Sequence, residues 1–320
     1  MTEKEFLDTY DSEKEILKAW GEFVSKKIID TLETKGIDSS KFLKISASSR
    51  VKDSQSLLAK AFYRGKNYKD PYNDITDKVG TRFVALLEED VRELCAIIEN
   101  IDEWTYTKDR DYELERADEP FSFNYQSMHY IVKPKEIINY KNINISQKIS
   151  CEIQVRTLLQ HAYSELTHDR VYKVSFDPTS EVKRVVAKSM AFLETTDEYF
   201  QKVSELMLDL PIFKLYNKLK DKYSEINPNF KDASKVNIHI LNAYYTFINN
   251  NDFSDKEDIF NEFDKTVKFN LGKTYLNDQP IIYFIYYMCN HHQNIFKKDW
   301  IYTVEEYKKY FTQLGISITE

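Results

Sequence analysis

Apolar residues recur at helical spacing near the start of the chain and alternate with polar residues further on. The segment 11–35 has apolar residues three or four positions apart, and Gly36 follows as a helix stop, so it predicts an amphipathic helix. Strand patterns, either alternating or continuously apolar, follow at 42–47, 79–87, 104–108, 125–132 and 148–156. Helical patterns lie between them at 53–64, 91–101 and 158–172. This order predicts an α+β domain with an α/β core, a mixed β-sheet flanked by helices.

A different pattern begins after Pro178. Residues 180–208 keep apolar positions at helical spacing, which predicts one long helix. After Pro211 the composition shifts to Asn, Lys, Tyr and Phe, and helical patterns follow near 212–224, 233–249, 255–269, 280–296 and 303–313. We therefore predict three parts: a mixed-sheet domain with its N-terminal helix (1–178), a connecting helix (179–210) and an all-helical C-terminal domain (211–320).

The composition is that of a globular protein outside the membrane. The chain is 42% hydrophobic and 30% charged, and it contains neither a bilayer-spanning apolar run nor a signal peptide, so we expect a cytoplasmic protein without a membrane partner. The odd, widely spaced Cys95, Cys151 and Cys289 fit reduced thiols better than disulfides or zinc ligands. The net charge of -7 disfavours general nucleic-acid binding, so any polynucleotide contact must be local.

Candidate chemistry is concentrated in the last predicted strand. Glu152, Gln154 and Arg156 alternate with apolar residues and therefore share one strand face. A carboxylate, an amide and a guanidinium on one face suit a metal-bound phosphate. An amphipathic edge strand with a polar outer face gives the same pattern, so this segment alone leaves both interpretations open.

Three further segments carry polar residues at fixed spacing. They read Arg50-x-Lys52-x-x-x-Ser56-x-x-x-Lys60, Asp77-x-x-Gly80-x-Arg82 and Tyr125-x-Ser127-x-His129. Together with Glu152-x-Gln154-x-Arg156-Thr157, they resemble in type and order the synthetase domain of the RelA/SpoT family, the (p)ppGpp alarmone synthetases. The resemblance covers roughly the first 200 residues. Because no His-rich hydrolase pattern accompanies these motifs, the chain resembles the small stand-alone synthetases, a group that includes toxic members.

The resemblance implies a nucleotidyltransferase-like fold and a pyrophosphokinase. Such an enzyme transfers the β,γ-pyrophosphate of ATP to the 3′-hydroxyl of GDP or GTP. Asp77 and Glu152 match the family's two acidic positions, which are catalytic and hold Mg²⁺, the expected cofactor. Mg²⁺ prefers one or two carboxylates together with waters and phosphates. Glu152 is also a candidate for orienting or deprotonating the acceptor hydroxyl.

The resemblance divides the remaining site residues between donor and acceptor. The ATP side comprises Arg50, Lys52, Ser56, Lys60 and Arg82. Arg50 and Arg82 match the pair that stacks on adenine, a role that needs a planar guanidinium. Tyr125 matches the tyrosine that stacks on the acceptor guanine. The other acceptor-side candidates are His129, Gln154, Arg156 and His161.

Two departures from the family pattern fall on the acceptor side. Asn124 replaces the usual Gly before Tyr125, in a loop that also contains Phe121 and Phe123, and His161 replaces a base-contacting Asn. The acceptor therefore stays open between GDP, GTP, an adenine nucleotide and the 3′ end of tRNA. A basic cluster near the acceptor would favour tRNA, and its candidates are Lys173, Lys183, Arg184 and Lys188.

An alternative to any catalytic function is a non-catalytic nucleotide sensor or interaction module. The intact pair Asp77 and Glu152 argues against it. The expected small-molecule partners are ATP and GDP or GTP. The C-terminal helical domain could serve self-association or bind a regulatory protein, such as an antitoxin, and nothing in its residues selects among these roles.

Overall fold

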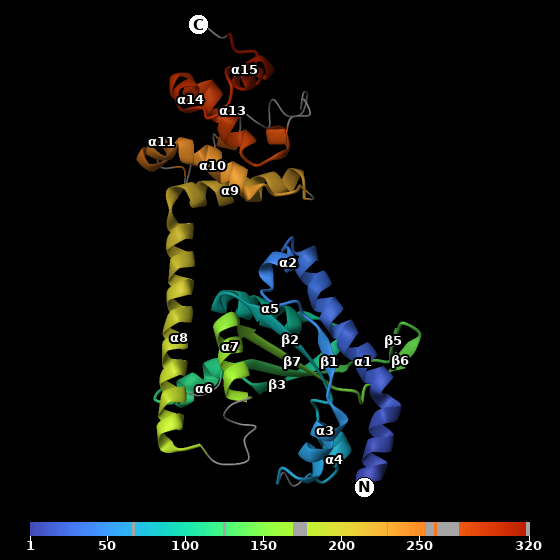
Figure 1. The fold of residues 1–320 in the computed structure, drawn as a ribbon. Coiled ribbons are helices and arrows are strands. Elements are labelled where there is room, and N and C mark those ends of the chain that lie inside the picture. Colours follow the sequence, from blue (N-terminus) through green and yellow to red (C-terminus); the bar gives the residue numbers. More distant parts are fainter. Residues whose placement is uncertain are drawn as a thin grey trace. The chain divides into compact units, whose positions relative to one another are not determined.

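The computed structural model describes residues 1–65, 68–123, 126–168, 178–228, 230–251, 253, 259–260 and 275–317. The chain divides into two compact units, Met1–Gln201 and Lys202–Glu320 (Figure 1). The long helix predicted over 180–208 is present as α8 (Ser180–Asp209). Its residues up to Gln201 group with the first unit.

The first unit is built on a five-stranded mixed sheet with the order β1-β2-β7-β4-β3. β2 and β7 are parallel, and the other neighbours are antiparallel. The predicted mixed sheet is therefore confirmed. Its strands are β1 (Ser49–Val51), β2 (Val79–Ala85), β3 (Trp104–Arg110), β4 (Met128–Pro134) and β7 (Cys151–Thr157).

Helices and one hairpin complete this unit. The helices are α1 (Glu3–Thr34), α2 (Ser39–Phe42), α3 (Ser54–Phe62), α4 (Pro71–Asp74), α5 (Glu88–Asn100), α6 (Tyr112–Asp118) and α7 (Leu158–Thr167). The separate hairpin pairs β5 (Ile138–Tyr140) with β6 (Ile143–Ile145). Lys141 and Asn142 form its two-residue turn with φ of 52° and 64°, values typical of a type I′ hairpin.

Helix α1 supplies much of the core. It begins in a capping box between Thr2 and Glu5, so it starts well before the predicted residue 11. Its buried side chains, including Trp20, Val24 and Ile28, belong to the same apolar cluster as the sheet. Gly21 lies where α1 crosses β1 and β2, and a Cβ there would come within 2.7 Å of Ser49 and Val79 side-chain atoms. The absence of a side chain at residue 21 therefore permits the close crossing.

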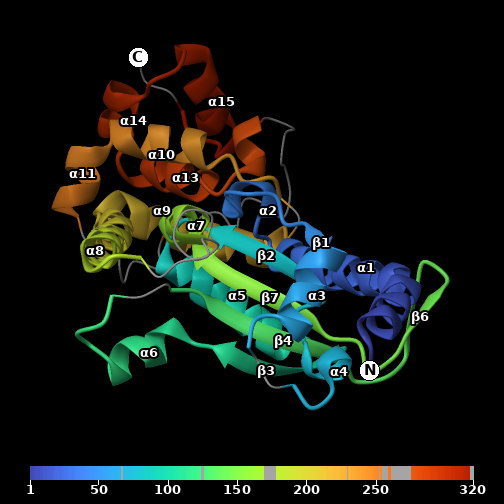
Figure 2. The same cartoon turned by 60° about the horizontal axis from the view of Figure 1, so that its bottom comes forward.

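The two faces of the sheet differ in character. Phe83, Ile153 and Val155 are fully buried in the core that α1 and α5 help to form. Figure 2 shows α1 and α5 beside the sheet. Arg82 and Gln154 alternate with these core residues and pair with each other in the parallel register of β2 and β7. The polar face is therefore free of core packing and can form a site.

The structure corrects several details of the sequence prediction. The strand predicted over 42–47 is wrong, because residues 39–42 form α2 and only Ile45 makes a bridge, to Val84. Helix α6 and the β5–β6 hairpin were not predicted. The helix predicted over 158–172 is confirmed as far as Thr167, and residues 169–177 lie outside the described part of the chain.

The second unit is helical in its described residues, as predicted. Its elements are α9 (Pro211–Ile226), α10 (Ser234–Ala243), α11 (Tyr245–Asn250), the 3₁₀ helix η2 (Tyr275–Asp278), α13 (Ile282–His291), α14 (Gln293–Asp299) and α15 (Val304–Gln313). The single helices predicted over 233–249 and 280–296 are each divided in two, at Tyr244 and His292. Most of the helix predicted over 255–269 lies outside the described residues.

A separate apolar cluster fills the second unit, with α13 buried from Ile282 to Cys289. Among the described residues, no helix combines the length and apolarity needed to cross a bilayer. Cys95, Cys151 and Cys289 are buried free thiols. Burial raises the pKa of Cys95 to about 11, so this thiol stays protonated and unreactive at neutral pH.

Candidate active site

Strand β7 carries a row of polar side chains that hold one another. The Gln154 amide donates to Glu152 Oε2 at 2.8 Å, and Arg156 Nη2 donates to Gln154 Oε1 at 3.2 Å. β7 lies between β2 and β4, so it is an inner strand and the edge-strand interpretation is wrong. Arg156 is only 1% exposed, and burial of a guanidinium is rare unless it is paired. The row is therefore a fixed polar wall.

Asp77 lies between two lysines. Its Oδ2 atom is 2.5 Å from Lys52 Nζ, just after β1, and 2.7 Å from Lys60 Nζ on α3. Burial disfavours the charged carboxylate, but the two ammonium groups outweigh it and lower the pKa of Asp77. The other oxygen, Oδ1, is buried and has no hydrogen-bond partner among the described residues. Asp77 therefore keeps one acceptor atom for a further ligand.

The second carboxylate is also ionised at neutral pH. Burial opposes the charge on Glu152, yet its hydrogen bonds with His129 and with the Gln154 amide outweigh it and lower the pKa of Glu152. His129 Nδ1 lies 3.3 Å from Glu152 Oε1. The negative charge of Asp77 acts in the opposite direction on Glu152, so the two carboxylates are close enough to repel each other.

The polar wall and the lysine-bound carboxylate share one cavity of about 510 Å³. Seven residues predicted from the motifs line it: Arg50, Lys52, Ser56, Asp77, Arg82, Glu152 and Gln154. Arg64 and His168 line it as well. Lys60 and Arg156 act on the cavity through their contacts with Asp77 and Gln154. The residues predicted for the donor side therefore lie together in space. The basic side chains among them, Arg50, Lys52 and Arg82, can hold the phosphates of a nucleotide.

Arg82 and His161 share one carboxylate on α7. Arg82 Nη1 donates to Glu165 Oε1 at 3.0 Å, and His161 Nδ1 lies 3.6 Å from the same atom. Burial and the positive charges of Arg156 and Arg82 lower the pKa of His161, so its imidazole is neutral at neutral pH. A neutral ring can offer a hydrogen-bond acceptor as well as a donor, unlike a protonated one.

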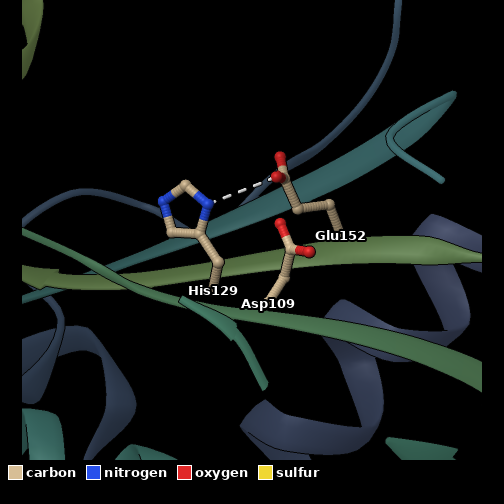
Figure 3. Close-up of side chains that lie close together, drawn as sticks. All are labelled: Asp109, His129 and Glu152. Atoms are coloured by element: carbon tan, nitrogen blue, oxygen red, sulfur yellow. Dashed lines mark ion pairs between the residues drawn. The ribbon is translucent and has the colours of Figure 1, made fainter. Parts of the chain in front are cut away.

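The acceptor side is described only in part. Tyr125 and Asn124 lie outside the described residues, so the predicted stacking tyrosine stays a prediction. Phe121 is 96% exposed and Phe123 38% exposed just before them. His129 does not line the cavity but contacts Glu152 from β4. The sequence prediction missed Asp109 on β3, whose carboxylate lies beside His129 and Glu152 (Figure 3).

A network of buried polar side chains connects the site to helix α8, and the sequence motifs did not predict it. Thr157 caps α7, and its Oγ1 atom donates to Asp197 Oδ2 on α8 at 2.7 Å. Gln126 donates to Glu194 on α8 at 2.6 Å and accepts from Arg116 on α6 at 2.6 Å. Helix α8 is therefore tied to the end of β7 and to the segment before β4.

The mixed sheet and the cavity lined by basic and acidic side chains define an α+β domain with a candidate phosphate site. Comparison with known proteins narrows the class of protein. Residues 49–177 match the family profile described as the region found in RelA / SpoT proteins. All four motifs lie within this segment, so the predicted resemblance to the RelA/SpoT family is confirmed for residues 49–177. No curated protein sequence matches the chain.

The chain is also similar to solved structures of small alarmone synthetases and their relatives. Small alarmone synthetase 1 from Bacillus subtilis superposes with a TM-score of 0.52 at 19% identity, over 63% of this chain and 99% of that one. A GTP pyrophosphokinase family protein from Streptococcus pneumoniae gives 0.49 at 24% identity, over 64% and 93%. The Bacillus enzyme bound to its product pppGpp gives 0.47 at 23% identity, over 64% and 97%. The first of these matches confirms the predicted fold class.

Proposed function

We propose that the chain is a Mg²⁺-dependent pyrophosphokinase that transfers the β,γ-pyrophosphate of ATP to the 3′-hydroxyl of GDP or GTP. The cavity carries this proposal, because residues from three separate motifs meet in it. Its lining combines the basic groups Arg50, Lys52 and Arg82 with the carboxylates Asp77 and Glu152. The RelA/SpoT region over residues 49–177 supports the same reaction class.

The two carboxylates fit the expected cation. Asp77 Oδ1 is buried without a hydrogen-bond partner among the described residues, and the charges of Asp77 and Glu152 repel each other. A divalent ion held by these oxygens would give Asp77 Oδ1 a partner and would offset the repulsion between the two carboxylates. When bound, Mg²⁺ would neutralise charge on the phosphates of ATP.

The chain's own groups account for the remaining requirements of the transfer. Lys52 and Lys60, already paired with Asp77, supply positive charge for the triphosphate. Arg50 and Arg82 offer planar guanidinium groups for the adenine. The acceptor 3′-oxygen would attack the β-phosphorus, the bond from the α,β-bridging oxygen to that phosphorus would break, and AMP would leave. Glu152, held by His129 and Gln154, is placed to orient the hydroxyl or take its proton.

A second acceptor class is favoured by the exposed aromatic loop. Phe121 and Phe123 present their rings to solvent immediately before Tyr125. Exposed aromatic rings stack on unpaired bases at roughly 1–3 kcal/mol per base and with little base preference. The second candidate function is therefore pyrophosphate transfer to an adenine nucleotide or to the unpaired 3′ end of tRNA.

One acceptor panel tests both candidates. Purified full-length protein with γ-labelled ATP and Mg²⁺ is offered GDP, GTP, ADP, ATP or deacylated tRNA in separate reactions. The primary proposal predicts labelled product with GDP or GTP, and the second predicts it with adenine nucleotides or tRNA. A folded Glu152→Gln variant serves as the negative control and should give no labelled product. Absence of transfer to every acceptor would favour the non-catalytic sensor instead.

A further inference from the structure

Three neighbouring strands bring together a candidate second cation site that includes Glu152. Asp109 on β3, His129 on β4 and Glu152 on β7 each offer one ligand atom, and these atoms lie within 4.8 Å of one another. Figure 3 shows the imidazole and both carboxylates pointing toward a common point. Asp109 and His129 lie outside the lining of the cavity described above, whereas Glu152 belongs to it. The cluster is therefore distinct from the predicted Asp77–Glu152 pair but shares one residue with it.

An irregularity in β3 places Asp109 in this cluster. Lys108 pairs with Tyr130 and Arg110 pairs with His129, so Asp109 is the extra residue of a β-bulge. A bulge sets two consecutive residues opposite one residue of the partner strand, and it re-aims a side chain. Both Asp109 and Arg110 thereby come opposite His129.

Arg110, the neighbour of Asp109, is paired with Glu115 on α6. Its Nε and Nη2 atoms donate to the two carboxylate oxygens of Glu115 at 2.8 and 2.9 Å. A bidentate pair of this kind fixes the guanidinium in one direction. The cluster thus keeps two carboxylates near one imidazole, with the adjacent arginine held by another partner.

The donor set indicates the class of ligand. Imidazole nitrogen suits Fe²⁺, Ni²⁺, Cu²⁺ and Zn²⁺, whereas carboxylates suit Mg²⁺, Ca²⁺ and Mn²⁺. One imidazole beside two carboxylates therefore combines the two classes, and Mn²⁺ is the transition-metal ion that accepts the carboxylate majority. Two ligand atoms at roughly 2.2 Å from one cation lie at most about 4.4 Å apart, so small side-chain rotations would bring all three within reach. A shared carboxylate is also how two-metal sites connect their ions.

We propose that Asp109, His129 and Glu152 bind a divalent transition-metal ion of the Mn²⁺ type, additional to the Mg²⁺ expected at Asp77 and Glu152. The site goes beyond the proposed reaction, because it rests on the geometry of three strands and needs no nucleotide. A bound ion would place a positive charge beside Glu152, on the side where the acceptor candidate His129 lies. A phosphate of the acceptor nucleotide could bind there.

Mn²⁺ binding to the nucleotide-free full-length protein tests the site. Electron paramagnetic resonance follows the free ion during titration, and electron spin echo envelope modulation detects a ¹⁴N nucleus bound to Mn²⁺. The wild-type protein should bind Mn²⁺ with a nitrogen signal. His129→Gln should abolish that signal, and Asp109→Asn should weaken binding at least about tenfold. Asp77→Asn should retain the nitrogen-coupled ion.

The matched control is Asp102→Asn, because Asp102 is a fully exposed aspartate just before β3 and should not affect binding. Bound Mn²⁺ without nitrogen coupling in the wild type would overturn the proposal, as would a wild type that binds no Mn²⁺. Unchanged affinity and coupling in both Asp109→Asn and His129→Gln would overturn it equally. Since no nucleotide is present, failure of pyrophosphate transfer leaves this result standing, and the two proposals fail separately.

Discussion

Asp197 on α8 is a buried acid whose charge should weaken the folded state. It is 1% exposed and accepts a hydrogen bond from the Thr157 hydroxyl, which also caps α7. Burial raises its pKa from 3.8 to about 6, the Thr157 bond opposes this, and the charge of Glu88 adds to it. We predict that Asp197→Asn stabilises the protein at pH 8, because the amide keeps an acceptor for Thr157 and carries no charge.

The sign and size follow from proton linkage. The folded pKa lies above the unfolded one, so the contribution of Asp197 is fully present below pH 3.8 and is lost as pH rises through about 6. A difference of about two in pKa corresponds to roughly 3 kcal/mol in the free energy of unfolding. The advantage of the Asp197→Asn variant should therefore grow from near zero at pH 4 to at most about 3 kcal/mol at pH 8.

Urea unfolding of both proteins between pH 4 and 8, at constant ionic strength, measures this difference. Tryptophan emission reports mainly the first unit, because Trp20 and Trp104 are buried in its core and only Trp300 lies in the core of the second. Glu198→Gln, at the next and exposed position of α8, is the control and should shift stability little at any pH. A constant difference between Asp197→Asn and wild type across this range, or a less stable variant at pH 8, would refute the burial argument.

Four further predictions address the site and its support. Asp77→Asn and Glu152→Gln should each lower turnover at least about 100-fold with unchanged circular dichroism, and near wild-type turnover in either would contradict the assignment. Arg82→Ala should weaken calorimetric ATP affinity and Arg82→Lys should not restore it, since the ammonium lacks the plane; full recovery would disprove stacking. His161→Asn should raise the preference for guanine over adenine acceptors, whereas equal changes in all acceptor rates would make the residue structural. Gly21→Ala should lower unfolding free energy by about 1–3 kcal/mol, because its Cβ would overlap β1 and β2 side chains; unchanged urea unfolding would argue against that crowding.

The pattern of apolar and polar residues predicted the elements whose side chains alternate or repeat regularly along the chain. The alternation around Glu152, Gln154 and Arg156 is present in β7, and the long apolar repeat of 180–208 is present as α8. The same pattern gave wrong helix ends where a helix is interrupted but the apolar spacing continues. Tyr244 and His292 divide two predicted helices, since the apolar spacing continues across each break.

The short elements escaped prediction for the opposite reason. Helix α6 is rich in Glu and Asp, so it has almost no apolar period, although Asp111 caps it in the usual way. The segment 42–47 alternates like a strand, but its only ladder contact is the bridge from Ile45.

The candidate site divides along similar lines. The motif residues of the donor side meet in one cavity, because their strands β1, β2 and β7 are neighbours in the sheet. Asp109 could not be found in this way, since a β-bulge leaves no trace in the alternation of the polar segment 105–111. Asp197 lies 40 residues after its partner Thr157, on a helix whose pattern shows only that it is amphipathic.

The position of the label after transfer tests the central claim most directly. ATP labelled in the α-phosphate is incubated with the protein, Mg²⁺ and GDP or GTP, and a parallel reaction carries the label in the β-phosphate. Pyrophosphate transfer predicts that the α-label appears in AMP and the β-label on the acceptor, in equal amounts, and that both vanish in Glu152→Gln. An α-label on the acceptor would mean nucleotidyl transfer, and an α-label in ADP would mean simple phosphoryl transfer; either result would contradict the account.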